Sequence, residues 1–147
     1  MAMIEGIPLP ATDEPLDAPF WQAALRGELV IQRCASCGAR RFPSRPMCPG
    51  CQSFEHIWQP MSGAGRIWSF VIPHPPLLPS FAKLAPYNVI LVELADDPAI
   101  RMVGNLVTAA GAPINEVDPR RLAIGMPVRA VFDRVADDLA LIRWVAA

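Results

Sequence analysis

The sequence is poor in charged residues, and lysine is almost absent from it. Charged residues make up 18% of the 147 positions and hydrophobic residues 52%, whereas average soluble domains are about 25% charged. Positive charge comes almost entirely from arginine, because Lys83 is the only lysine. The net charge of -1 gives no overall attraction for a phosphate backbone, which argues against a protein whose main partner is nucleic acid.

Long apolar runs and a secretory leader are also missing. The best apolar stretch, residues 89–94, contains Glu93 and falls far short of the roughly 18 residues of a membrane helix. The first ten residues carry Glu5 and Pro8 where a secretory signal has a basic segment followed by an apolar one. We therefore expect a cytoplasmic protein with no membrane span. Spare apolar surface on so short a chain favours a role in a protein complex.

Common catalytic motifs are absent as well. The sequence has no G-x-S-x-G elbow, no P-loop and no H-E-x-x-H segment. Gly63-Ala64-Gly65 lacks the third glycine and the helix of a dinucleotide-binding turn, so it predicts a bend into a strand. His56 and His74 have no recognisable partner, and a structural role is the simpler interpretation. His74 lies at the expected mouth of a barrel, which makes it a candidate for ligand contact.

The sequence does contain four cysteines, arranged as two C-x-x-C pairs. Cys34 and Cys37 form the first pair, ten residues intervene, and Cys48 and Cys51 form the second. Two such turns present four thiolates to one tetrahedral ion, and Gly38 permits the tight first turn. Zinc is the ion we expect. A rubredoxin-like iron centre and two disulfides are the alternatives.

This cysteine usage predicts a structural metal rather than a catalytic one. Four thiolates close the coordination shell, so the ion has no open position at which to bind substrate or activate water. No thiol is left over for thioester chemistry, and we expect no acyl-CoA activity from the chain alone. Residues 29–60 are too few to build a core, so the ribbon should fold only when it binds metal.

The remaining segments predict a mainly β protein. Residues 1–28 indicate an arm and a short helix, with Asp17 as cap and Gly27 as stop, and the 17 prolines argue against a helical fold. Runs rich in β-branched and aromatic residues occupy 66–74, 87–94, 100–107, 128–135 and 139–145. The long connection over 108–127, with a helical turn near 119–122, favours a five-stranded Greek-key barrel of the OB type over residues 61–147. An open sandwich is the alternative.

Two short segments carry large apolar side chains that they cannot bury by themselves. The expected helix holds Phe20 and Trp21, and a proline-stiffened loop between the first two barrel strands holds Leu77, Leu78 and Phe81. Large aromatic side chains are typical anchors of protein interfaces. We predict that one or both segments contact a partner.

Arginines concentrate around the predicted ribbon. Residues 26–66 hold six arginines against Glu28 and Glu55, and Arg40, Arg41 and Arg45 lie between the cysteine pairs. Guanidinium groups suit bidentate contacts with phosphate or carboxylate. We expect at least one of the three to contact an anionic group; solvated ribbon surface is the alternative interpretation.

The order of these features resembles a known family. The segments concerned are Phe20-Trp21, Gly27-Glu28-Leu29, Arg33-Cys34 to Cys51, Gly63-Ala64-Gly65, His74, Pro86-Tyr87 and Gly125-Met126-Pro127-Val128. Together they resemble the acyl-CoA-associated OB-fold proteins with an N-terminal rubredoxin-like zinc ribbon. The most specific part comprises Arg33-Cys34-x-x-Cys37-Gly38, Arg41-Phe42-Pro43-x-Arg45 and Cys48-Pro49-x-Cys51. Ser44 stands where the family commonly has a second proline.

The resemblance implies an accessory subunit. Members of this family typically act beside thiolase-like enzymes in condensation, thiolysis, retro-aldol cleavage or acyl transfer, and the OB subunit can help to hold the CoA chain. It implies a zinc-binding, non-catalytic partner of a thiolase-like protein, with Arg40, Arg41, Arg45 and His74 as candidate contacts to acyl-CoA or the partner. The alternatives are a nucleic-acid-binding zinc-ribbon and OB protein, and an independent enzyme that uses His74.

Overall fold

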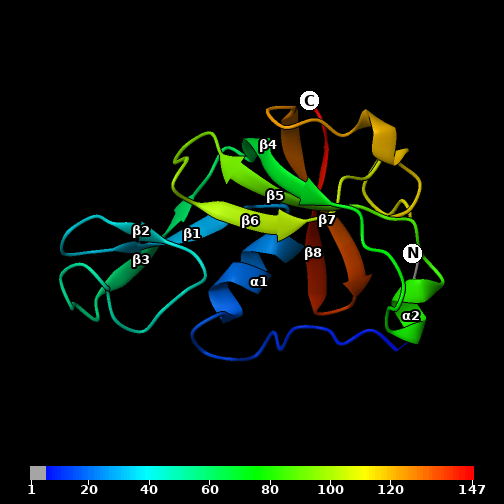
Figure 1. Cartoon of the computed structure of the whole chain (residues 1–147). Helices are drawn as coiled ribbons and strands as arrows, with labels where there is room; N and C mark the ends of the chain where they lie inside the picture. Colours follow the sequence, from blue (N-terminus) through cyan, green and yellow to red (C-terminus); the bar gives the residue numbers. More distant parts are fainter. Residues whose placement is uncertain (1–5) are drawn as a thin grey trace.

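The computed structural model describes residues 6–147 and contains two antiparallel β-sheets (Figure 1). The smaller sheet has the order β2-β1-β3 and consists of β1 (Val30–Cys34), β2 (Arg40–Arg41) and β3 (His56–Pro60). The larger sheet has the order β6-β5-β4-β7-β8 and consists of β4 (Ala64–Val71), β5 (Val89–Leu94), β6 (Arg101–Gly104), β7 (Pro127–Ala136) and β8 (Leu139–Ala146). The prediction of a mainly β protein with a ribbon ahead of five barrel strands is confirmed.

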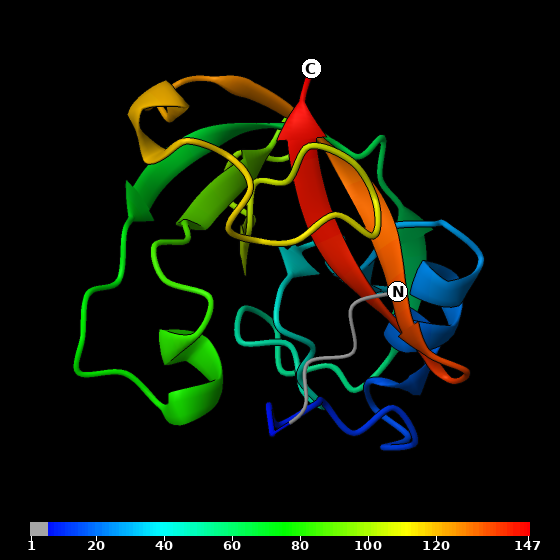
Figure 2. The same ribbon diagram turned by 90° about the vertical axis from the view of Figure 1, so that its right-hand side faces the viewer.

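The five-stranded sheet curls until its two edge strands meet (Figure 2). A parallel bridge joins Leu106, just after β6, to Trp144 of β8. The backbone N–H of Trp144 donates to the carbonyl of Asn105 over 3.0 Å, and the N–H of Val107 donates to the carbonyl of Trp144 over 2.8 Å. Sequential strands pair on one side and a long connection joins β6 to β7, which is the connectivity of the predicted Greek-key barrel.

The closing point is fixed from within the core. The side chain of Asn88 is buried, accepts from the backbone N–H of Leu106 over 2.6 Å and donates to its carbonyl over 2.9 Å. The indole of Trp144 is fully buried beside Gly104, where an added Cβ would lie 2.8 Å from the indole Cδ1. Only glycine allows this close approach of β6 to the tryptophan.

The helix α1 (Ala18–Leu25) begins after Asp17 and ends before Gly27, whose φ of 77° suits a helix stop, as predicted. The Asp17 side chain makes no capping hydrogen bond and instead accepts from the hydroxyl of Ser44 in the ribbon. The helix packs against β8, β7 and β1, and buries Phe20 with Ala23 in the main core.

This packing removes Phe20 from the predicted partner surface. Its ring is only 7% exposed and lies 5.6 Å from the ring of Phe42, between the barrel and the ribbon. The chain buries this side chain in its own core, so Phe20 offers a partner little surface. Trp21, next to it, stays partly exposed.

The loop between β4 and β5 contains the short helix α2 (Pro79–Ala82), and the long connection contains the turn η1 (Pro119–Arg121) close to where a helical turn was predicted. In the first loop Leu78 is 64% exposed. Leu77 and Phe81 are half-buried against a second apolar cluster that includes Tyr87. Within residues 6–147, no helix has the length and apolar character needed to cross a membrane.

Gly65 should be as intolerant of a side chain as any position in the barrel. A Cβ there would lie 2.6 Å from Cγ1 of Val92 and 2.7 Å from the backbone oxygen of Glu93, and the backbone atom cannot move aside. We expect Gly65→Ala to lower the free energy of unfolding by about 1–3 kcal/mol in urea denaturation. Ala64→Ser, at the exposed neighbouring position, is the control and should stay within about 0.5 kcal/mol of the parent. Equal stability of both variants would contradict the close packing of β4 on β5.

Candidate functional site: a four-cysteine cluster beside an apolar groove

The four cysteines converge on one point. Cys34 ends β1, Cys37 follows in the adjoining turn, and Cys48 and Cys51 lie in the second turn. All four Sγ atoms lie within 4.8 Å of one another, with 3.5 Å between Cys34 and Cys51 and 3.6 Å between Cys37 and Cys48. Four sulfurs bound at about 2.3 Å to a tetrahedral ion are spaced about 3.8 Å apart, whereas a disulfide requires about 2.05 Å. The donor set fits one metal ion.

Two similar turns hold the sulfurs in place. The N–H of Gly38 donates to the carbonyl of Cys34 over 3.0 Å, and the N–H of Gln52 donates to the carbonyl of Cys48 over 2.9 Å. Both residues have positive φ, 78° for Gly38 and 64° for Gln52. Glycine adopts this conformation freely, so Gly38 has the role predicted for it. Gln52 adopts it at a cost of about 1 kcal/mol, which makes the second turn the more strained one.

The pKa values of three of the cluster's thiols are shifted, two downward and one upward. A backbone contact from Cys37 is the main cause that lowers the pKa of Cys34 to about 6, and one from Cys51 is the main cause that lowers the pKa of Cys48. Ser53 favours the Cys51 thiolate, but Cys34, burial and the other two sulfurs outweigh it and raise the Cys51 pKa to about 11. The cluster therefore keeps a proton at neutral pH unless a cation offsets the negative charge.

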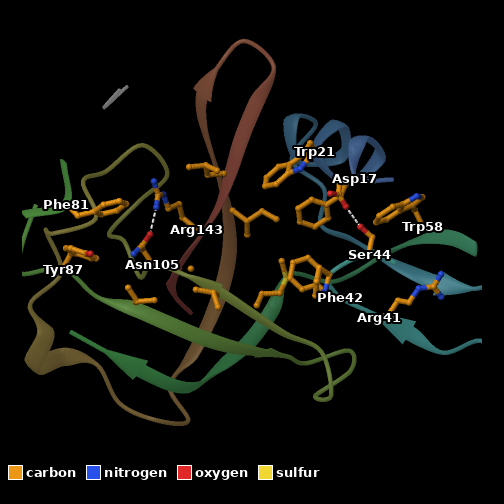
Figure 3. A pocket seen from close by; sticks show the side chains of 18 residues that line it. Asp17, Trp21, Arg41, Phe42, Ser44, Trp58, Phe81, Tyr87, Asn105 and Arg143 are labelled. Atoms are coloured by element: carbon orange, nitrogen blue, oxygen red, sulfur yellow. Dashed lines mark hydrogen bonds between the residues drawn. The ribbon is translucent and has the colours of Figure 1, made fainter. Parts of the chain in front are cut away.

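An apolar groove of about 470 Å³ lies beside the ribbon, between α1 and the facing edges of β6 and β8 (Figure 3). Most of its wall is apolar, formed by Phe20, Trp21, Phe42, Trp58, Met102, Val103, Leu141 and Ile142. The side chains of Asp17, Ser44 and Arg41 lie toward the ribbon end, and Asn105 and Arg143 lie toward the other. The sequence pointed to Trp21 and Phe81 here, but not to the wall supplied by β6 and β8.

The three ribbon arginines occupy different environments. Arg41 lines the groove, is 6% exposed, and donates through Nη2 to the carbonyl of Arg45 over 3.1 Å. Its Nε and Nη1 are buried and have no partner among residues 6–147. Arg40 bonds Gln59 over 2.9 Å and pairs with Asp97 over 3.3 Å. The side chain of Arg45 is exposed. Of the predicted anion contacts, only Arg41 lines the groove, at its ribbon end, and its two unpaired nitrogens are closed off from solvent.

At the far end a buried polar group interrupts the apolar wall. Arg143 is 7% exposed, donates through Nη1 to the side-chain oxygen of Asn105, and has its Nε 3.5 Å from the carboxylate of Asp133. Only one feature of the sequence indicates that Arg143 is special, namely that it is the one charged residue in the apolar strand β8. His74 is exposed in the loop after β4 and does not line the groove.

The groove continues past Arg143 beneath the N-terminal arm. A second cavity of about 310 Å³ shares Phe81, Asn105, Leu141 and Arg143 with the first. Its outer wall is residues 7–10 of the arm. Residues far apart in the sequence thus form one elongated depression that runs from the ribbon to the arm.

Comparisons with known proteins agree with this arrangement. Residues 21–56 match the family model described as "ChsH2, rubredoxin-like zinc ribbon domain", and residues 58–133 match "ChsH2, C-terminal OB-fold domain". Between them the two models span the ribbon and the barrel from β4 into β7, whereas β8 and its share of the groove wall lie beyond the matched residues.

Curated relatives carry two kinds of names. A "Probable enoyl-CoA hydratase alpha subunit" from Thermomonospora curvata is 41% identical over 82% of this chain, and a "3-oxo-4,17-pregnadiene-20-carboxyl-CoA hydratase alpha subunit" from Mycobacterium tuberculosis is 38% identical over 77%. The chain spans about a third of the length of each, 34% and 32%. A "DUF35 domain-containing scaffold protein" from Methanocaldococcus jannaschii is 35% identical over 75% of this chain and 71% of its own length.

The fold also matches a solved structure closely. A chain of the "Ltp2-ChsH2(DUF35) aldolase" superposes with a TM-score of 0.76 at 34% identity, over 93% of this chain and 98% of that one. The match therefore includes helix, ribbon and barrel together. The chain belongs to the ChsH2 family, in which a rubredoxin-like zinc ribbon precedes a C-terminal OB-fold domain.

Proposed function

We propose that this chain is a non-catalytic accessory subunit that binds and supports a thiolase-like enzyme acting on acyl-CoA. The observation that carries the proposal is the match over 93% of the chain to the ChsH2(DUF35) component of an aldolase that also contains Ltp2. The archaeal relative matches over 75% of this chain and 71% of its own length, and its name, "scaffold protein", supports the same accessory role. The reaction of the partner is condensation, thiolysis, retro-aldol cleavage or acyl transfer.

The chemistry of the described residues supports a non-catalytic role. All four thiols face one another in the ribbon, in an arrangement that fits one metal ion. The groove offers Asn105 and Arg143, which bond each other, and a carboxylate of Asp17 that accepts from Ser44. Thioester chemistry needs an activated nucleophile, and the residues that line the groove include no cysteine and no histidine; Ser44 beside Asp17 is the hydroxyl–carboxylate pair that they offer.

In this function, acyl-CoA shared with the partner would lie in the groove. Its walls suit an apolar chain, and Arg41 at the ribbon end has buried donors for an anionic group. Arg40, Arg45 and His74 lie outside it and would reach CoA or the partner only at its margins. A nucleic-acid partner fits less well, because the net charge is -1.

The hydratase names favour a second candidate partner. The chain corresponds to about a third of two hydratase alpha subunits, so the same ribbon and barrel occur in proteins with that name. In this alternative the chain supports a hydratase. Copurification from the native host followed by mass spectrometry separates the two candidates by the identity of the protein recovered.

We propose zinc as the metal, because four thiolates in a closed tetrahedral site are its usual structural ligand set. The ribbon's thiols also suit a reducing compartment, which supports a location in the cytoplasm. When bound, the ion holds the two turns together and adds no chemistry of its own. The chain's contribution is to place β2 and the segment around Phe42 against the barrel.

We expect one zinc per chain and loss of the ribbon in Cys48→Ser. Removing a ligand leaves the tetrahedral shell one thiolate short, so metal affinity and ribbon structure should fall together. Elemental analysis by mass spectrometry and circular dichroism measure both. Ser36→Ala, in the first turn but not a ligand, is the control and should keep its zinc. Protein that folds unchanged without zinc or iron would refute the assignment.

We expect Arg41→Gln to weaken CoA binding to the complex about tenfold, equivalent to ~1.4 kcal/mol. The loss should shrink at high salt, because a charge contact is being removed. Isothermal titration calorimetry at low and high salt measures it. Arg45→Gln, at an exposed position outside the groove, is the matched control. Equal effects of the two variants would mean that the groove does not bind the anion.

We expect the isolated chain to turn over no acyl-CoA, and Trp21→Ala or Phe81→Ala to weaken its complex with a thiolase-like partner about tenfold. Both side chains are half-buried at the groove rim. Truncation should therefore weaken the complex clearly while it changes the melting temperature of the free chain little. Coexpression with Ltp2 and gel filtration test this. Ile124→Ala, 71% exposed on another loop, is the control. Acyl-CoA turnover by the chain alone would defeat the non-catalytic role.

A further inference from the structure

The barrel is closed at one point and open along the rest of its seam. The edge strands bond through Asn105, Val107 and Trp144, and between residues 6 and 147 no further backbone hydrogen bond joins them. On the open side the groove is lined by residues 102–104 of β6, by Asn105 just after it, and by residues 141–143 of β8. The groove therefore lies along an unpaired strand edge (Figure 3).

The backbone groups that point into the seam follow from the register. In an antiparallel pair, bonded and non-bonded residue pairs alternate. The N–H of Leu94 donates to the carbonyl of Ile100, so the pairs with Met102 and Gly104 are the bonded ones. The N–H and C=O of Val103 therefore point away from β5 and into the seam. Asn105, two residues on, follows this alternation, because its carbonyl accepts from Trp144 across the seam.

This edge has only part of the usual protection. Natural edge strands are blunted by short length, charged side chains, proline, bulges or a covering segment, and β6 is short, with four residues. Residues 101–104 contain no lysine or proline and keep a regular register with β5. Val103 is 69% exposed, and no described residue hydrogen-bonds its backbone. The guanidinium of Arg101 lies over the ring of Trp68, 3.9 Å from its centroid, rather than free beside the edge.

We propose that an extended segment of the thiolase-like partner adds a strand to the β6 edge, with its apolar side chains against the groove wall formed by β6 and β8, and leaves the ribbon end with Arg41 to acyl-CoA. This inference rests on the proposed function. Main-chain pairing supplies affinity in strand addition, and side-chain pockets supply specificity. An acyl chain has no groups to match the free N–H and C=O of Val103, whereas a peptide does.

A proline at position 103 tests the pairing directly. Val103→Pro removes the N–H that points into the seam and no hydrogen bond within the chain, so the fold should tolerate it at an edge. Val103→Ala removes most of the same side chain and keeps the N–H. With coexpressed Ltp2 as the probe, we expect Val103→Pro to weaken the complex at least tenfold and Val103→Ala less than threefold. Zinc content and melting temperature of each free variant check folding.

Amide hydrogen exchange gives a readout that needs no variant. In the complex, the N–H groups of Arg101 and Val103 should exchange at least tenfold more slowly than in the free chain. Met102 and Gly104 are already bonded to β5 and serve as internal controls. If both Val103 variants bind Ltp2 like the parent, or the Val103 amide gains no protection, strand addition is overturned while the accessory role stands. If the parent itself does not bind Ltp2, the partner assignment fails and this inference fails with it.

Discussion

The convergence of four thiolates is the constraint on which the rest of the site depends. The ribbon has little apolar interior of its own, since Val30 and Ile31 pack into the core shared with the barrel. Without an ion, sulfurs 3.5 Å apart repel as thiolates and keep a proton. The two turns flank β2 and Phe42, whose ring lies 5.6 Å from the ring of Phe20 in α1. The four-cysteine cluster therefore adjoins the segment that supplies the second wall of the groove.

The barrel contributes the other wall by closing incompletely. Asn88 and Trp144 fix the crossing of β6 and β8, and Gly104 lets the strand approach the indole. Beyond that crossing the two edges diverge, and α1 with the ribbon covers only part of the gap. An OB barrel normally hides its edges by closure. Here the open part of the seam carries both apolar surface and free backbone groups, which is the combination that a partner chain can use.

The sequence by itself determined the metal centre, the order of the elements and the family. Spacing of the two C-x-x-C pairs is local information, because each turn is built from consecutive residues such as Cys34 to Gly38. Strand runs and turns are local as well, and five of them in this order left few topologies to consider. The count of cysteines also predicted that a four-cysteine cluster would use every thiol, and all four Sγ atoms do lie together.

Only the tertiary structure decided which side chains share a surface. Phe20 and Trp21 are neighbours in the sequence, yet one is in the core and the other at the groove rim, because a helix turns them by about 100° relative to each other. The three ribbon arginines are close together in the sequence but lie in different environments in space: Arg40 pairs with Asp97, Arg41 is buried, and Arg45 is exposed. The free edge at Val103 depends on where β8 crosses β6, a contact between residues nearly forty positions apart that no local pattern encodes.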